Sequence, residues 1–143
     1  MIRKNCAIRQ TGVVLLEALV AVFIFSFGIL GLVGMYAASI KNSTEAKFRT
    51  DAAFLVDSLV AQMQVSDEVG RKTSFASPDG DAFKKWRDDR VYAVLPGAKI
   101  TGAEPSVVFG TANSSEVTIT LKWQAKNDSA IRKYVVTSIL DSK

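Results

Sequence analysis

The apolar residues of this chain follow three patterns in succession, and the first is a nearly unbroken run. From Gly12 to Ala38 the only charged residue is Glu17, and Ser26 is the only polar interruption after it. A helix rises about 1.5 Å per residue, so a bilayer core of about 30 Å needs roughly 20 apolar residues. Because backbone groups inside a bilayer must be paired within the chain, the run predicts one membrane helix over residues 13–38.

The second pattern is an apolar stripe at helical spacing over residues 39–66. Its members recur every three or four positions, which is typical of a helix with one buried face: Phe48, Ala52, Leu55 or Val56, Leu59 and Met63. Charged residues occupy the opposite face: Lys41, Glu45, Lys47, Arg49, Asp51 and Asp57. We therefore predict that the helix continues to about Ser66. The stripe is interpreted as core that packs against a sheet, in preference to a groove for a partner.

The region after this helix predicts a linker and a second, shorter helix. Residues Gly70–Gly80 have linker composition, and their last four residues, Ser77–Gly80, favour a turn. Asp81–Leu95 is expected to be helical and to end at Pro96-Gly97. Four apolar residues of this helix lie near one face: Phe83, Trp86, Val91 and Val94.

The third pattern is alternation of apolar and polar residues, which predicts strands between residues 99 and 140. Glu116–Gln124 places four apolar side chains on one side: Val117, Ile119, Leu121 and Trp123. Ile131–Leu140 alternates less strictly and places five residues on one face: Ile131, Lys133, Val135, Thr137 and Ile139. Lys99–Thr101 and Ser106–Phe109 are shorter candidates, and Asn127-Asp128 supplies the hairpin turn.

Together these patterns predict an α+β fold in which the helical stripe covers one face of a small antiparallel sheet. At 143 residues, the chain has room for one small domain beside the membrane helix. The globular head is expected to cover residues 67–143, including the short helix at 81–95 and the strands at about 99–140.

The net charge of +4 comes from 18 basic and 14 acidic residues. Three of the basic residues, Arg3, Lys4 and Arg9, precede the apolar run with no acidic residue among them. This bias predicts a cytoplasmic N-terminus. Without these three residues the charges nearly balance, so the basic character indicates membrane topology, and no nucleic-acid partner is expected.

The residues available for chemistry are few. The chain has no histidine, and its single cysteine, Cys6, precedes the apolar run. Asp79 and Asp81 flank a glycine, but a calcium loop needs several further oxygen ligands, so a solvated turn is favoured. Trp86 and Trp123 are interpreted as buried anchors in preference to surface recognition residues. We therefore expect no enzymatic activity, no metal or cofactor and no small-molecule substrate.

The carboxylate of Glu17 needs a partner, because a charge at the centre of a bilayer costs about 2.5–3.5 kcal/mol and still carries a cost near its edge. The apolar run contains no cation. Cleavage after Gly12 would create an α-amino group at Val13, one helical turn from Glu17. That amine could meet the carboxylate of its own chain or of a neighbouring subunit.

The basic leader, Gly12, the apolar run and Glu17 resemble the class III signal of type IV prepilins and type II secretion pseudopilins. That family has glycine, phenylalanine, threonine, leucine, an aliphatic residue and glutamate, where this chain has Gly12-Val13-Val14-Leu15-Leu16-Glu17. Val13 and Val14 therefore depart from the family's pattern. The resemblance implies cleavage between Gly12 and Val13 by a prepilin peptidase, followed by N-methylation of Val13.

Later features narrow the resemblance to the PilV-type minor pilins. They are Gly28-Ile29-Leu30-Gly31-Leu32, Asp81 with Trp86, Leu95-Pro96-Gly97 and the Val-Thr-Ile-Thr-Leu-Lys-Trp strand that ends at Trp123. Such a resemblance implies a type IV pilin-like fold with a leader over residues 1–12 and a transmembrane assembly helix over 13–38. The amphipathic half of the helix would follow at 39–66.

The implied function is that of a structural subunit that helps to prime pilus assembly. It would cross the inner membrane once, with its head in the periplasm, and then join the pilus at its tip. The implied partners are a prepilin peptidase and N-methyltransferase, other minor pilins, the major pilin and inner-membrane lipid. Glu17 would set the register between subunits. Gly28, Gly31 and Gly34 would either loosen the assembled helices or act as ordinary small residues in membrane packing.

Other interpretations lead to different functions. A minor pseudopilin of a type II secretion system shares much of the layout. An uncleaved anchor whose Glu17 snorkels to the interface would tether a periplasmic enzyme or binding domain. A secretory signal peptide cut after Ser39 is disfavoured because its apolar region would exceed the usual 7–15 residues. A lipoprotein signal at Cys6 fails because no apolar run precedes it.

Overall fold

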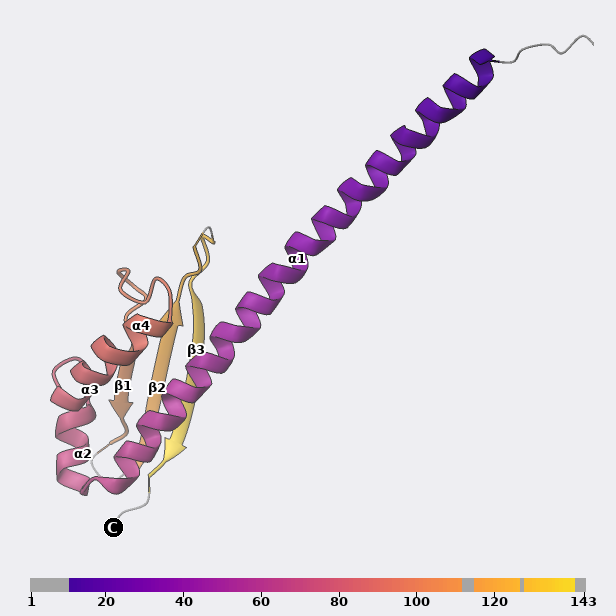
Figure 1. Cartoon of the computed structure of the whole chain (residues 1–143). Coiled ribbons are helices and arrows are strands. Elements are labelled where there is room, and N and C mark those ends of the chain that lie inside the picture. Colours follow the sequence, from indigo (N-terminus) through magenta and orange to yellow (C-terminus); the bar gives the residue numbers. More distant parts are fainter. Residues whose placement is uncertain (1–10, 112–114, 127, 141–143) are drawn as a thin grey trace, which may run out of the picture. The chain divides into compact units, whose positions relative to one another are not determined.

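The computed structural model describes residues 11–111, 115–126 and 128–140. The chain divides into two compact units, Met1–Thr44 and Glu45–Lys143, which we call the first and second units. Helix α1 (Thr11–Val65) contributes to both of them (Figure 1). Its end at Val65 confirms the predicted end at about Ser66. Each unit is described by itself below.

In the first unit, the described residues form the N-terminal part of α1. The apolar side chains are exposed all round the helix, and the helix is long and apolar enough to cross a membrane. The Ser26 hydroxyl donates a 2.7 Å hydrogen bond to the Val22 carbonyl, so this polar group is satisfied within its own helix. The rings of Phe23 and Phe27 meet edge to face with their centroids 4.7 Å apart.

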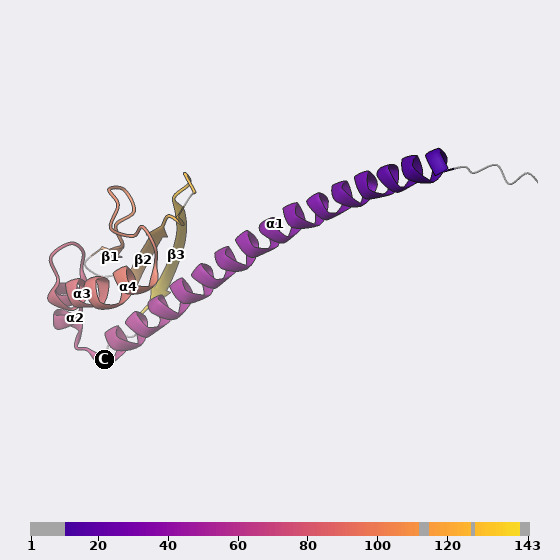
Figure 2. The same ribbon diagram turned by 45° about the horizontal axis from the view of Figure 1, so that its top comes forward.

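The second unit combines helices with a three-stranded antiparallel sheet, which confirms the predicted α+β layout (Figures 1 and 2). Besides the end of α1, its elements are α2 (Glu68–Phe75), α3 (Asp81–Trp86), the π-helix η1 (Arg87–Val91), α4 (Tyr92–Val94), β1 (Ser106–Phe109), β2 (Glu116–Trp123) and β3 (Arg132–Ile139). The strands lie in the order β1-β2-β3, so β2 is central and β3 forms one edge.

The register of the sheet explains which side chains reach the core. Val117 of β2 lies opposite Phe109 of β1 and Ser138 of β3. The predicted inward residues of β2 are all buried: Val117, Ile119, Leu121 and Trp123. The predicted buried stripe of α1 is confirmed as well, because Ala52, Leu55, Val56, Leu59 and Met63 belong to the core and Phe48 packs against it.

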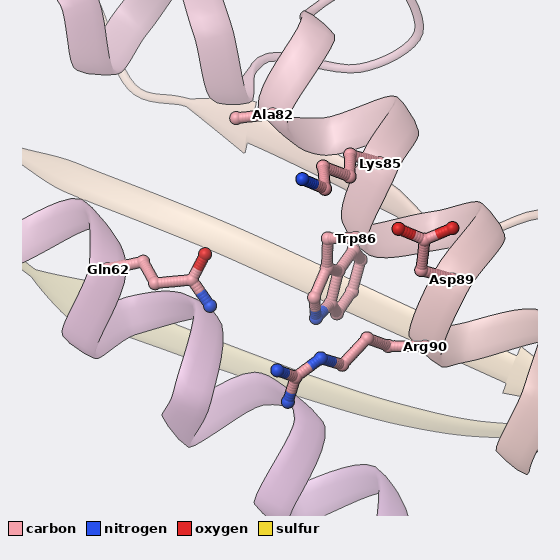
Figure 3. A pocket seen from close by; sticks show the side chains of 6 residues that line it. All are labelled: Gln62, Ala82, Lys85, Trp86, Asp89 and Arg90. Carbon is pink, nitrogen blue, oxygen red and sulfur yellow. The ribbon is translucent and has the colours of Figure 1, made fainter.

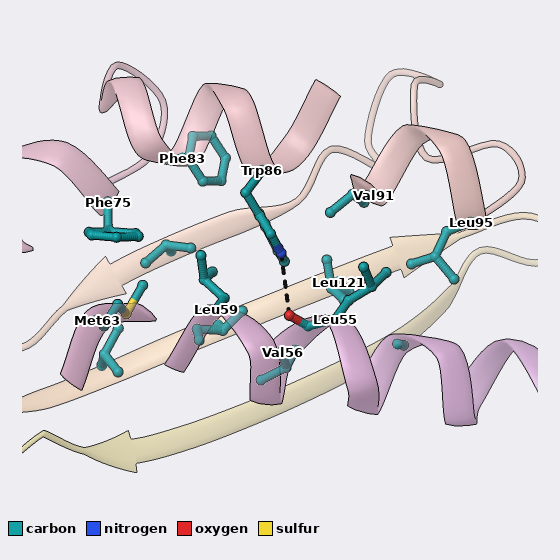
Figure 4. Packing of buried hydrophobic residues seen from close by; sticks show 14 of the residues in the cluster. Leu55, Val56, Leu59, Met63, Phe75, Phe83, Trp86, Val91, Leu95 and Leu121 are labelled. Atoms are coloured by element: carbon teal, nitrogen blue, oxygen red, sulfur yellow. Dashed lines mark hydrogen bonds between the residues drawn. The ribbon is translucent and has the colours of Figure 1, made fainter. Parts of the chain in front are cut away.

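The core lies between the sheet and a layer formed by α1 and the shorter helices (Figure 4). Phe75, Phe83 and Val91 reach it from α2, α3 and η1. Trp86 spans the layer, since its indole Nε1 donates a 3.3 Å hydrogen bond to the Leu55 carbonyl of α1. Trp86 and Trp123 are both buried, which confirms their interpretation as anchors.

The predicted linker over Gly70–Gly80 is wrong in its first half, because Glu68–Phe75 forms helix α2. Asp67 caps this helix by accepting a 2.8 Å hydrogen bond from the Gly70 amide. The Glu68–Lys72 pair, 3.0 Å apart, supports the first turn. The turn expected after the helix is present at residues 77–79.

The strand predicted at Lys99–Thr101 is also wrong, because these residues lie in consecutive turns. The Ile100 amide donates to the Gly97 carbonyl, and the Ala103 amide donates to the Ile100 carbonyl. Gly97 has φ +68°, a left-handed conformation that directs the chain away from an extended path.

The helix predicted at Asp81–Leu95 is present, although η1 interrupts it with a π turn closed by the Tyr92 amide and the Arg87 carbonyl. Val94 is 42% exposed, so its predicted place on the buried face is wrong.

In β3 the predicted face that carries Lys133, Val135, Thr137 and Ile139 is the exposed one. The residues that alternate with them are half-buried. Asp128 lies in a turn, and Asn127 lies outside the described residues.

Candidate functional site

The first candidate site is the start of the apolar helix. Val13 and Glu17 are four residues apart in α1, so they lie on the same face, separated by about 6 Å along the axis. Both residues are exposed. Within the part of the chain that the structure describes, no group forms a hydrogen bond or ion pair with the Glu17 carboxylate. The predicted leader lies mostly outside the described residues.

The predicted packing glycines lie further along the same helix. Gly28, Gly31 and Gly34 are three residues apart, so each is displaced about 60° around the axis from the one before. A Cβ atom built at any of them would meet nothing within 4 Å. Within the described chain, therefore, packing does not require glycine at these positions.

The second unit carries several ion pairs that sequence patterns did not identify. At the turn between β2 and β3, Arg132 donates a 3.1 Å hydrogen bond to Asp128. It also lies 3.7 Å from Glu45 of α1, too far for a hydrogen bond but close enough for charge attraction. The bond to Asp128, with the charge of Glu45, raises the pKa of Arg132. This cluster connects the start of β3 to α1.

A second ion pair joins neighbours in η1. The Arg87 guanidinium donates hydrogen bonds of 2.7 and 3.1 Å to the two carboxylate oxygens of Asp88. These bonds hold the pKa of Asp88 below its ordinary value and raise the pKa of Arg87. Arg87 also lies over the rings of Phe83 and Tyr92, at 5.7 and 5.6 Å from their centroids. Asp88, Asp89 and Arg90 are exposed, so this side of the helix faces solvent.

Next to this pair, a hollow of about 360 Å³ opens over the Trp86 indole (Figure 3). Its lining comes from α1, α3 and η1: Gln62, Ala82, Lys85, Trp86, Asp89 and Arg90. The lining has cations, a carboxylate and an amide but no hydroxyl or thiol nucleophile. Sequence patterns placed Trp86 in the core but gave no signal for the hollow around it.

The described residues do not provide a set of ligands for a metal ion. Over residues 11–111, 115–126 and 128–140, no group of three or more histidine, cysteine, aspartate or glutamate residues could hold a metal ion. Asp79 and Asp81, the candidates flanking Gly80, are exposed. Gly80 itself is close to the backbone, since a Cβ there would lie 2.3 Å from the Ser74 carbonyl oxygen. This crowding is enough to explain why the turn requires glycine, and the explanation involves no bound ligand.

No protein-family model matches the sequence, and searches of curated proteins and of solved structures found no match.

Proposed function

We propose that this protein is a minor type IV pilin of the PilV type, a structural subunit that helps to prime pilus assembly. In this proposal a prepilin peptidase cleaves between Gly12 and Val13, and the new amino group of Val13 is methylated. The subunit crosses the inner membrane once, with its N-terminus in the cytoplasm and its head in the periplasm. It then joins other minor pilins and the major pilin at the pilus tip.

The observation that carries the proposal is the position of Glu17 in an exposed, apolar helix. Its carboxylate has no partner among the described residues, and Val13 lies one helical turn away on the same face. Two opposite charges about 6 Å apart attract by about 3 kcal/mol at an effective dielectric constant of about 20. That attraction is similar in size to the cost of about 2.5–3.5 kcal/mol for a charge at the centre of a membrane. An amine created at Val13 would therefore stabilise the ionised carboxylate, within one chain or between neighbours.

The exposed helix around Glu17 supports the same proposal. A surface of large apolar side chains needs lipid, neighbouring helices or both to cover it. In an assembled fibre the same helices would form the apolar core, while the second unit would select the neighbours. No described residue lies within 4 Å of a Cβ built at Gly28, Gly31 or Gly34, which leaves space for close approach of other helices.

The decisive measurement is the intact mass of the protein purified from the cells that produce it. We expect a chain that begins at a methylated Val13. Replacing Gly12 with leucine should leave the precursor uncut, whereas the control Gly28→Ala should be processed normally. A native protein that retains Met1 would refute the proposal and favour an uncleaved membrane anchor.

A second measurement tests the role of Glu17 after processing. Glu17→Ala should insert into the membrane normally but should fall sharply in sheared pili, because subunits would lose the charge pair that sets their register. Ser26→Ala removes the other polar side chain of the apolar run and should assemble normally, since that hydroxyl bonds only to its own helix. Normal amounts of Glu17→Ala in pili would contradict the proposal.

The minor pseudopilin interpretation predicts the same cleavage, so a deletion strain must separate the two. Loss of twitching motility with intact protein export supports the pilin. Loss of exoprotein export with intact twitching motility would instead assign the chain to a type II secretion system.

A further inference from the structure

The hollow over Trp86 contains charged side chains that have no partners among the described residues. Lys85, Asp89 and Arg90 are all exposed, and none forms a hydrogen bond or ion pair with any residue that the structure describes. Other charges on the same unit do pair, as in Arg87–Asp88. Lys84 and Lys133 are also unpaired among the described residues, so what sets Lys85 and Arg90 apart is their place beside Trp86 in the lining of the hollow.

The π turn of η1 accompanies this arrangement. In a regular helix Lys85 and Asp89 would be four residues apart on one face and suited to pairing. No such ion pair forms here, and Asp89 lies within the π-helical segment Arg87–Val91. In Figure 3 the Lys85 amine and the Arg90 guanidinium lie on the side of the indole that faces α1, and the Asp89 carboxylate lies on the other side. Single π turns are frequent at functional sites.

The remaining walls also suit a bound polypeptide. The Gln62 amide donates its Nε2–H to the Ser58 carbonyl at 3.1 Å, so its oxygen is left to accept a hydrogen bond from outside. Trp86 and Ala82 are the apolar residues of its lining. Tryptophan and arginine are the residues most enriched where protein contacts contribute most to binding.

We propose that this hollow binds the carboxylate of an acidic side chain on another polypeptide, with Lys85 and Arg90 as the cationic contacts. Trp86 supplies the apolar floor under that side chain. Asp89 on the opposite rim disfavours a doubly charged anion such as phosphate, and it offers a site for a basic or amide group beside the acid. The proposal does not depend on the chain being a pilin, because it concerns only the surface of the second unit.

The test uses the full-length protein in membranes of the cells that produce it. A zero-length carbodiimide joins a lysine amine to a carboxylate only when the two are in contact, and peptide mapping then identifies both residues. We expect Lys85 to be joined to an aspartate or glutamate of another polypeptide. Lys84, its neighbour outside the hollow, is the matched control and should not be joined. Arg90→Gln should lower the Lys85 yield about threefold, the effect of losing one exposed charge contact.

Three results would overturn the proposal. They are the absence of any intermolecular link at Lys85, a yield at Lys84 equal to that at Lys85, and a Lys85 yield that Arg90→Gln leaves unchanged. Arg90 is exposed, so its variant should fold normally, and near-ultraviolet circular dichroism checks this. A separate measurement titrates inorganic phosphate against the NMR signal of the Trp86 indole N–H. Saturable binding at millimolar phosphate would replace the acidic side chain with a free oxyanion, whereas no saturable shift supports the proposal.

Discussion

The packing of α1 against the sheet predicts that Leu59→Ala strongly destabilises the second unit. Leu59 is fully buried, and it packs in one cluster with residues from the shorter helices and the sheet (Figure 4). The substitution removes part of a side chain from the middle of this cluster, where the surrounding elements cannot all move inward. Truncations of this kind cost about 2–5 kcal/mol through lost burial and the cavity left behind.

The matched control is Phe54→Ala on the same helix. The Phe54 side chain is also apolar and is larger than that of leucine, but it is 68% exposed. A substitution at such a surface position should change the free energy of unfolding by no more than about 0.5 kcal/mol. A ranking by side-chain size would predict the reverse order, so the pair tests the arrangement of this helix and not hydrophobicity in general.

The assay is thermal unfolding of the full-length protein in detergent micelles, followed by the near-ultraviolet signal of the tryptophans. For a domain of about 100 residues, 1 kcal/mol corresponds to about 4–8 °C in Tm. A loss of about 3 kcal/mol in Leu59→Ala should therefore lower Tm by about 12–24 °C. If Leu59→Ala shifts Tm as little as Phe54→Ala, the inference that this helix covers the sheet is refuted.

Three further predictions concern single contacts or backbone dihedrals of the second unit. In denaturant unfolding, Trp86→Phe should lower the free energy of unfolding by about 1 kcal/mol more than Trp123→Phe does. The reason is that the Trp86 N–H donates to a carbonyl of α1, whereas the Trp123 N–H is buried without a partner among the described residues. Equal losses of free energy in the two variants would contradict this. Asp88→Asn should be less stable than the wild type near neutral pH. The pKa of Asp88 is lowered in the folded state, so the difference should be fully present above about pH 4 and vanish as the pH falls through the folded pKa. A difference unchanged at about pH 2 would be inconsistent with the Arg87 hydrogen bonds as its cause. Gly97→Ala should lower the free energy of unfolding by about 2–3 kcal/mol, since φ is +68° and the new Cβ would lie 2.6 Å from a backbone carbonyl oxygen; a melting temperature equal to that of the wild type would show that the turn relaxes.

The fold could be predicted where side-chain periodicity and burial coincide. The stripe of α1 and the alternation of β2 each place one apolar face toward one core, and both predictions are confirmed. The prediction weakened where the pattern itself was weak. In β3 apolar residues occupy both faces, so alternation alone did not indicate that Val135 and Ile139 are exposed while Val136 packs against the core.

The two wrong elements have local causes. Gly70 made the segment after α1 resemble a linker, but its amide is the group that the Asp67 carboxylate caps, and a capped turn tolerates a glycine. Lys99–Thr101 contains a β-branched pair that favours a strand. Gly97 and Gly102, both with positive φ, fold that segment into turns instead. In both cases a single backbone contact or dihedral outweighed the average preference of the segment.

The two candidate sites differ in how far the sequence alone can reveal them, because one depends on an unusual residue and the other on backbone geometry. Glu17 is conspicuous because a charge in an apolar run is costly inside a membrane, so its need for a partner can be inferred from the order of residues alone. Lys85, Asp89 and Arg90 are ordinary surface residues by the same criterion, and their spacing predicts a pair that does not form. The free cations become evident only when the π turn and the position of Gln62 on α1 are known. The placement of these charges is thus set by the backbone geometry of η1, and cross-linking at Lys85 tests whether a carboxylate of another polypeptide binds beside them.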